Sequence, residues 1–284
     1  MTADTGCVIA EAAPAKVNLY LHIRGQRPDG YHILESLAVF PSVGDYLEAE
    51  PARGISLSLA GPFADTLPIS GDNLVLRAAE ALSQRTGVSA GASLRLTKNL
   101  PIASGIGGGS SDAAAALRLL SRLWSVSVPA DLAIGLGADV PVCMSHRPQF
   151  MSGVGEGVQP CMALPPAWMV LVNPMVSVPT AAVFNALATK TNPAGADFPA
   201  GGIATFGDLV AWLRLQRNDM EDAAIRICPP IGAVLETLSS APLARMSGSG
   251  ATCFALYQSA SEAERLADDI RARQPTWWVA TAPL

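Results

Sequence analysis

The sequence has few of the residues that mark a disulfide framework, a zinc site or a membrane span. Its five cysteines are an odd number, scattered, and form no Cys-x-x-Cys pair: Cys7, Cys143, Cys161, Cys228 and Cys253. This pattern predicts buried, reduced thiols and a cytoplasmic protein rather than a metal site. No apolar run reaches the roughly 18 to 20 residues that a spanning helix needs, and the first residues lack the regions of a signal peptide.

Positive charge is also scarce. The 284 residues include 19 Lys and Arg against 24 Asp and Glu, which gives a formal net charge of -5. Duplex binding needs a clustered basic surface, so a general nucleic-acid footprint is not expected. An acidic protein of this kind must hold a polyphosphate with local donors. With 50% hydrophobic and 15% charged residues, the chain is globular and long enough for one large domain or two modest ones.

Hydrophobic periodicity predicts an α+β protein without internal repeats. Residues 17–23 alternate as a strand with one apolar face, and Lys16 and Asn18 share its other face. Asp72 is the predicted N-cap of a helix that runs to Thr86 and stops at Gly87. Further strands are predicted at 36–40, 45–50, 55–59, 93–97, 149–151, 168–172, 244–246, 252–257 and 277–282. Further helices are predicted at 112–124, from 129 to about 136, and at 180–187, 206–215, 219–227, 231–238 and 261–273.

The segment from Pro101 to Ser111 is the most informative stretch. It places four glycines in five positions and leads into the helix predicted at 112–124, with Ser110 or Ser111 as its cap. Glycines let backbone N–H groups turn toward an anion, and a helix N-terminus adds the positive end of its dipole. The segment therefore predicts a phosphate site, although alone it does not distinguish a kinase. A plain turn that starts a helix is the alternative.

Two common phosphate-binding motifs do not fit this segment. A Walker A loop ends in Gly-Lys-Ser/Thr, whereas Gly109 is followed by Ser110 and Ser111. A dinucleotide-binding fingerprint needs a sixth-position glycine, which here is Ser110, and no acidic ribose partner follows about 20 residues later.

Residues 101–114 resemble the second signature of the GHMP kinases, the family of galactose, homoserine, mevalonate and phosphomevalonate kinases. The triple glycine with the Ser-Ser-Asp ending resembles the diphosphocytidyl-methylerythritol kinase branch, although Ile106 stands where leucine is usual. Three more stretches resemble the family in its order: residues 13–32, which end in Asp-Gly-Tyr-His, then the Gly-Ala-Asp-Val-Pro of 137–141, and 246–252 with Ser-Gly-Ser-Gly. The resemblance spans almost the whole chain.

The resemblance implies a role for particular residues. It makes Lys16 and Asp139 catalytic, with Asp139 as the base. It places the ATP phosphates on a loop formed by Pro101, Ile102, Ala103, Ser104, Gly105, Ile106, Gly107, Gly108, Gly109, Ser110 and Ser111, with Mg²⁺ held through Ser110 or Ser111. It places the substrate against Asn18, Tyr31, His32, Phe184, Gly248 and Ser249, with the cytosine between Tyr31 and Phe184 and hydrogen-bonded by His32.

Residue chemistry alone leaves simpler alternatives open. Lys16 is then a solvated charge, Asp139 caps a turn, and Tyr31 with His32 packs on the surface. Phe184 is equally a buried helix residue, and a Ser-Gly-Ser-Gly string is usually only a turn.

The fold implied is the two-lobed α+β GHMP kinase fold. Residues 1–155 would form an ATP-binding lobe like the second domain of ribosomal protein S5, and residues 156–284 a ferredoxin-like substrate lobe. The activity implied is ATP-dependent phosphorylation of the 2-hydroxyl of 4-diphosphocytidyl-2-C-methyl-D-erythritol, in the non-mevalonate isoprenoid pathway. No nucleic acid, membrane or obligate protein partner is expected. The competing hypotheses are a homoserine- or mevalonate-type kinase, a silent nucleotide-binding module on the same fold, and a NAD-dependent enzyme.

Overall fold

The computed structural model describes residues 8–66 and 72–284, so Cys7 lies outside the described residues. The chain forms two compact units that alternate along the sequence. The first unit comprises the chain up to Ala15 together with Gly44–Ile102 and Gly108–Ser145. The second comprises Lys16–Val43, Ala103–Gly107 and His146–Leu284. Residues 16–43 thus group with the C-terminal half, while the division of roles at residue 155 stays a prediction.

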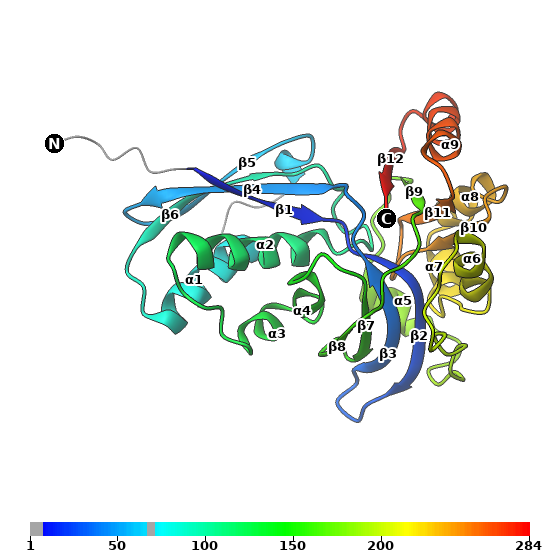
Figure 1. The fold of residues 1–284 in the computed structure, drawn as a ribbon, viewed down its shortest axis with the longest axis horizontal. Helices are drawn as coiled ribbons and strands as arrows, with labels where there is room; N and C mark the ends of the chain where they lie inside the picture. Colours follow the sequence, from blue (N-terminus) through cyan, green and yellow to red (C-terminus); the bar gives the residue numbers. More distant parts are fainter. Residues whose placement is uncertain (1–7, 67–71) are drawn as a thin grey trace. The chain divides into compact units, whose positions relative to one another are not determined.

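The first unit is built on a four-stranded sheet with the order β1-β4-β6-β5. Its strands are β1 (Ile9–Pro14), β4 (Gly44–Ala52), β5 (Ile55–Ala60) and β6 (Gly91–Thr97). Its helices are η1 (Ala64–Thr66), α1 (Leu74–Thr86), α2 (Gly108–Leu123), α3 (Leu132–Leu136) and α4 (Val140–Cys143). Helix α2 packs on α1 and runs along β1 and β4 (Figure 1). Its alanines 113–116 are fully buried, because small side chains let the helix approach the sheet closely.

Two helix starts in this unit differ from the prediction. The N-cap of α1 is Asn73, not Asp72, because Asn73 has the extended backbone of a cap and its side chain accepts from the Val75 N–H at 2.9 Å. Gly87 ends the helix in the left-handed conformation, as predicted. Helix α2 begins at Gly108 rather than at 112. Ser110 and Ser111 therefore lie in its first turn and do not cap it.

The second unit contains two four-stranded sheets. The sheet of order β2-β3-β7-β8 is formed by β2 (Val17–Gln26), β3 (His32–Val39), β7 (Gln149–Gly153) and β8 (Gly157–Pro160), all antiparallel. Both faces of β2 are buried. The polar face is covered by later segments of the unit: Tyr20 packs edge-on against Trp212, with ring centroids 5.7 Å apart, and His22 Nε2 accepts from the Arg217 N–H at 3.3 Å. The outer edge of β2 is also bonded, because Leu21 exchanges backbone hydrogen bonds with Arg217 and Asp219.

The other sheet has the antiparallel order β10-β11-β9-β12, which is the strand order of a ferredoxin-like fold, as predicted. Its strands are β9 (Trp168–Asn173), β10 (Leu243–Met246), β11 (Cys253–Tyr257) and β12 (Trp278–Pro283). The helices of the second unit are α5 (Thr180–Asn185), α6 (Phe206–Arg214), α7 (Glu221–Ile227), α8 (Pro230–Thr237) and α9 (Ala260–Arg273). Helices α8 and α9 pack on this sheet.

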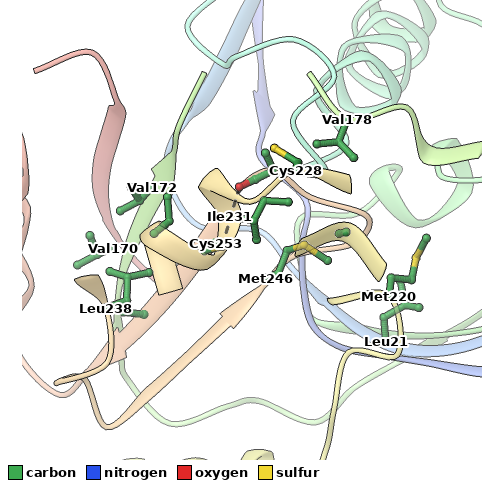
Figure 2. Packing of buried hydrophobic residues seen from close by; sticks show 14 of the residues in the cluster. Leu21, Val170, Val172, Val178, Met220, Cys228, Ile231, Leu238, Met246 and Cys253 are labelled. Carbon is green, nitrogen blue, oxygen red and sulfur yellow. Dashed lines mark hydrogen bonds between the residues drawn. The ribbon is translucent and has the colours of Figure 1, made fainter. Parts of the chain in front are cut away.

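An apolar core joins these helices to the sheet. Figure 2 shows Val170, Val172 and Cys253 of the sheet facing Ile231 of α8 and Leu238, the residue that follows α8. All five are fully buried. This core holds the turn between β10 and β11 on a rigid base, and that turn carries the last of the predicted site residues.

The remaining predictions about the fold hold with small changes. Strand β1 was not predicted, because Ile-Ala-Glu-Ala-Ala-Pro shows no clear alternation. The described cysteines carry free thiols, and Cys143, Cys228 and Cys253 are buried. Within the described ranges, no helix is long and apolar enough to cross a bilayer.

Candidate active site

The start of β2 is bonded to the middle of the glycine-rich segment, and both belong to the second unit. The backbone N–H of Lys16 donates to the Ile106 carbonyl at 2.8 Å. Gly107 has a φ of +63°, and a Cβ added there would lie 3.0 Å from the Lys16 Cβ. Lys16 itself is only 4% exposed, so it is not the solvated surface charge of the simpler alternative.

Asn18 lies two residues further along β2 and is 2% exposed. Its amide nitrogen donates to Ser36 at 2.7 Å, which orients the carboxamide. Its Oδ1 is buried, has no hydrogen-bond partner among the residues that the structure describes, and lies close to Gly248. A buried acceptor without a donor costs free energy, so this oxygen is suited to accept from a bound hydroxyl.

The turn between β10 and β11 closes on the same glycine-rich segment. The Thr252 N–H donates to the Ser104 carbonyl at 3.0 Å, and Ser247 Oγ donates to the Gly105 carbonyl at 3.1 Å. Gly105 and Gly248 both have positive φ. A Cβ on Gly105 would lie 2.7 Å from the Ser247 carbonyl oxygen, so only glycine permits this approach.

Asn218 holds this turn in shape. Its amide nitrogen donates to the Met246 carbonyl at 2.9 Å and to the Gly248 carbonyl at 2.8 Å. Its Oδ1 accepts from the Met220 N–H at 3.0 Å. Every polar atom of the carboxamide thus has a partner, which makes Asn218 a clamp on the turn.

The turn also reaches the predicted cytosine residues. Ser249 is 7% exposed, and its hydroxyl lies 2.8 Å from the hydroxyl of Thr180, the first residue of α5. Phe184 of α5 stacks on His32, with ring centroids 4.4 Å apart and an interplanar angle of 14°. Tyr31 precedes His32 and is 63% exposed.

The stack sets the orientation of His32. Within the described part of the chain, its Nε2 is buried without a hydrogen-bond partner. Burial lowers the pKa of the imidazole, with Lys190 adding to the effect. His32 is therefore neutral at pH 7 and can present both a donor and an acceptor nitrogen. Phe184 packs both on the apolar core and on His32, and its role against a cytosine stays a prediction.

The first turn of α2 is the second half of the glycine-rich segment and belongs to the first unit. The first N–H groups of a helix have no intrahelical partner, and in α2 they belong to Gly108, Gly109, Ser110 and Ser111. Ser111 is fully buried, and its Oγ has no hydrogen-bond partner among the described residues. The turn has the donors of an anion site and one spare hydroxyl.

Asp139 also belongs to the first unit, at the N-cap position of α4. Its side chain makes no capping hydrogen bond, so the carboxylate is not used to cap the turn, which was the simpler alternative. Lys16 lies in the other unit, and the proximity of these two side chains stays a prediction.

Comparison with known proteins identifies this arrangement. The family described as GHMP kinases N terminal domain matches residues 73–147, and the family described as GHMP kinases C terminal matches residues 196–276. The chain belongs to the GHMP kinase family. It is therefore an ATP-dependent phosphotransferase.

Individual relatives within the GHMP kinases match nearly the whole chain. A Cereibacter sphaeroides protein named 4-diphosphocytidyl-2-C-methyl-D-erythritol kinase is 54% identical over 275 residues, covering 95% of this chain and 97% of that protein. A Paramagnetospirillum magneticum protein of the same name is 49% identical over 286 residues, covering 96% and 97%.

Solved structures agree with this placement. A crystal structure of 4-(cytidine 5'-diphospho)-2C-methyl-D-erythritol kinase has a TM-score of 0.78 at 36% identity, covering 96% of this chain and 98% of that one. Homoserine kinase from Cytophaga hutchinsonii has a TM-score of 0.67 at 18% identity, covering 100% and 98%, which shows a shared fold alone.

One charged cluster of this GHMP kinase was missed in the sequence. Lys98 Nζ bonds to Asp45 and, at 2.7 Å, to Asp112, which follows the first turn of α2. All three side chains are at most 4% exposed. Asp45 also accepts from the backbone N–H groups of Asn99 and Leu100. The cluster ties the end of β6 to the first turn of α2, where a Cβ on Gly108 would lie 3.2 Å from the ammonium.

Burial and charge act against each other in this cluster. Burial raises the pKa of Asp112 to about 7, with Asp45 adding to the rise and Lys98 opposing it. Burial lowers the pKa of Lys98, but the two carboxylates outweigh it and raise the value overall. Lys98 is therefore fully charged. The only local signal for the cluster was a lysine directly after a buried strand.

Proposed function

We propose that this GHMP kinase phosphorylates the 2-hydroxyl of 4-diphosphocytidyl-2-C-methyl-D-erythritol at the expense of ATP, in the non-mevalonate isoprenoid pathway. The observation that carries the proposal is 54% identity over 95% of the chain to a kinase of that name. The second unit supports it independently, because Tyr31 offers an exposed ring for a cytosine and His32, held against Phe184, offers a neutral imidazole.

The first turn of α2 and the glycines before it would bind the phosphates of ATP. Backbone N–H groups and the helix dipole both favour an anion there. Glycine at 105 and 107 keeps positive φ and lets the backbone lie close to Lys16 and to the turn after β10. Asn18 Oδ1 would accept a hydrogen bond from the substrate.

The chemistry is a single displacement at phosphorus. The substrate oxygen forms a bond to the γ-phosphorus of ATP while the bond from that phosphorus to the bridging oxygen breaks and ADP leaves. Asp139 would accept the hydroxyl proton as the new bond forms. Lys16 would offset the negative charge that develops on the transferred group.

Mg²⁺ is the metal that this chemistry implies, and the residues present would supply a small part of its ligands. Ser111 supplies a buried hydroxyl without a partner, and Ser110 lies beside it in the first turn of α2. The described residues contain no group of three or more His, Cys, Asp or Glu that could hold a metal. Phosphate oxygens and water would complete the shell, as is usual for this ion. Bound Mg²⁺ neutralises phosphate charge.

The proposal is tested by measuring ADP release from Mg-ATP with 4-diphosphocytidyl-2-C-methyl-D-erythritol, with homoserine and mevalonate in parallel. Turnover is expected only with the cytidyl substrate. Asp139→Asn should lower kcat by about 10² to 10⁴-fold, the usual contribution of a general base. Asp131→Asn is the matched control, because Asp131 is the N-cap residue of the neighbouring helix α3 and also makes no capping hydrogen bond.

The outcomes separate the hypotheses. Turnover with homoserine or mevalonate instead would keep the kinase and replace the substrate. ATP binding without turnover on any alcohol would favour a silent nucleotide-binding module. Equal activity in the Asp139 and Asp131 variants would remove Asp139 from the base role.

A further inference from the structure

Ser247 is not among the residues that the resemblance assigns to the site, yet its hydroxyl connects two segments that are. It accepts a hydrogen bond from the Asn18 backbone N–H at 3.0 Å and donates to the Gly105 carbonyl at 3.1 Å. Asn18 and Ser247 are separated by 229 positions in the sequence. All three residues belong to the second unit.

The hydroxyl occupies a place that the β-ladder leaves open. β2 is an edge strand of its sheet, with β3 as its neighbour on one side. A backbone N–H on the other side has no ladder partner, and where it is buried it needs another acceptor. Ser247 Oγ is that acceptor for Asn18.

The same hydroxyl has one hydrogen to donate, and it goes to Gly105. A serine hydroxyl has one donor and two acceptor lone pairs, so the two bonds together define its rotamer and its hydrogen position. Ser247 has no measurable exposure, and water therefore cannot replace either bond without rearrangement. Losing the hydroxyl would leave the buried Asn18 N–H unpaired and would remove a donor from the half-buried Gly105 carbonyl.

The backbone around Ser247 is held as firmly as its side chain. Its N–H donates to the Thr252 carbonyl at 2.9 Å, and its carbonyl accepts from the Gly250 N–H at 3.0 Å. A Cβ on Gly248 would lie 2.9 Å from the Gly105 carbonyl oxygen, so the two glycine turns lock against each other. Ser247 is thus a rigid point from which the other two segments are positioned.

We infer that Ser247 is a positioning residue for phosphoryl transfer, setting the register between the Lys16–Asn18 strand and residues 104–107 of the glycine-rich segment. The inference rests on the proposed function. Lys16 is tied to Ile106 directly, and Asn18 is tied to Gly105 through Ser247. These two connections fix the positions of the Lys16 side chain and the Asn18 carboxamide relative to the glycine-rich segment.

Ser247→Ala tests the inference, with Thr252→Val as the matched control. Thr252 is equally buried in the same turn, and its hydroxyl bonds to Asn173 at 2.8 Å rather than to Asn18 or Gly105. Ser247→Ala should lower kcat on the order of 10²-fold, the usual effect of a small misplacement of reacting groups, with little change in KM for ATP. Ser247→Thr keeps the hydroxyl and should restore most of the activity.

Hydrogen–deuterium exchange supplies a readout that needs no turnover. Ser247→Ala should speed exchange at the Asn18 amide and across residues 104–107, whereas Thr252→Val should leave both as in the unmodified protein. If Ser247→Ala does not fold, Ser247→Cys fills the same space with a weak donor and should show both effects in smaller degree.

Three results would overturn the inference. They are equal kcat losses in the Ser247 and Thr252 variants, faster local exchange without a loss of kcat, and a lowered melting temperature as the only change. Absence of turnover in the unmodified protein would instead refute the proposed function, and the exchange experiment would still decide whether Ser247 ties the two segments.

Discussion

Replacing Asp112 by asparagine should make the protein more stable at pH 8, although it removes a charge from a buried ion pair. Asp45 and Asp112 share a single ammonium, that of Lys98, so the cluster carries one uncompensated negative charge when both are ionised. One oxygen of Asp112 is also buried without a hydrogen-bond partner. Asparagine keeps the shape and the acceptor toward Lys98 while removing the excess charge.

The magnitude follows from the pKa of Asp112, which rises from 3.8 to about 7, first because of burial. The folded state holds this proton more tightly than the unfolded chain. The stabilisation is therefore complete below pH 4 and is lost as the pH rises to about 7. About three pKa units correspond to about 4 kcal/mol. The difference in unfolding free energy between Asp112→Asn and the unmodified protein should shift by about that amount in favour of the variant between pH 4 and pH 8.

Urea denaturation followed by circular dichroism across that range measures the difference. At pH 8 the net gain should be about 1–3 kcal/mol, since the asparagine N–H₂ then occupies the unpartnered position at a cost of about 1–3 kcal/mol. Lys98→Met is the contrasting variant, because it leaves two buried carboxylates without a cation and should cost about 3–5 kcal/mol. A difference that does not vary with pH, or variants that shift stability in the same direction at pH 8, would refute this account of the cluster.

Two further predictions concern buried groups of the second unit. His22 is fully buried, and burial, with Arg217 adding to the effect, lowers its pKa to about 4. The neutral form of His22 therefore stabilises the fold above pH 6.5. This contribution, about 3 kcal/mol, is lost as the pH falls from 6.5 to 4. Urea denaturation at pH 4 to 7 should show that His22→Gln lacks this loss, and an unchanged pH profile would contradict it. Arg245 donates to the carbonyls of three residues in two other segments. Arg245→Met should therefore lower the unfolding free energy by about 3 kcal/mol or more. Arg226→Met, which removes one exposed hydrogen bond, should leave the unfolding free energy nearly unchanged. Equal midpoints for these two variants in urea would count against the structural role of Arg245.

Local chemistry was enough to predict most helices and strands. It failed where two adjacent residues could take the same role, or where tertiary contacts decided the local conformation. Asp72 and Asn73 are both good caps, and only the backbone conformation at Asn73 decides between them. The Gly-Gly-Ser-Ser run at 108–111 favours a loop in isolation. It is helical because Asp112 pairs with Lys98 and the alanines after it are buried against the sheet, and both are tertiary effects.

The site was predicted as far as its residues lie in recognisable segments. Alternation along the strand placed Lys16 and Asn18 on one face, and the glycines predicted an anion-binding turn. Alternation did not predict that this face would be buried, because Trp212 and Arg217, which cover it, come from beyond position 200. The Ser-Gly-Ser-Gly string includes Ser247, but no local pattern could indicate its bond to Asn18, which crosses most of the chain. The roles assigned to Lys16 and Asp139 stay predictions.

The alternation of the two units along the chain has a consequence for folding during synthesis. β2 and β3 form a hairpin that can close soon after it leaves the ribosome. The Ile23 N–H, however, cannot form its hydrogen bond until Asp219 has been synthesised, 196 positions later. At about 5–20 residues per second, that interval is about 10–40 s. During this time the outer edge of β2, which the later chain covers, is open to other partners. The first unit is complete once residue 145 has been synthesised. Strand β2, which begins the second unit, is therefore synthesised early but gains its last hydrogen-bond partners late.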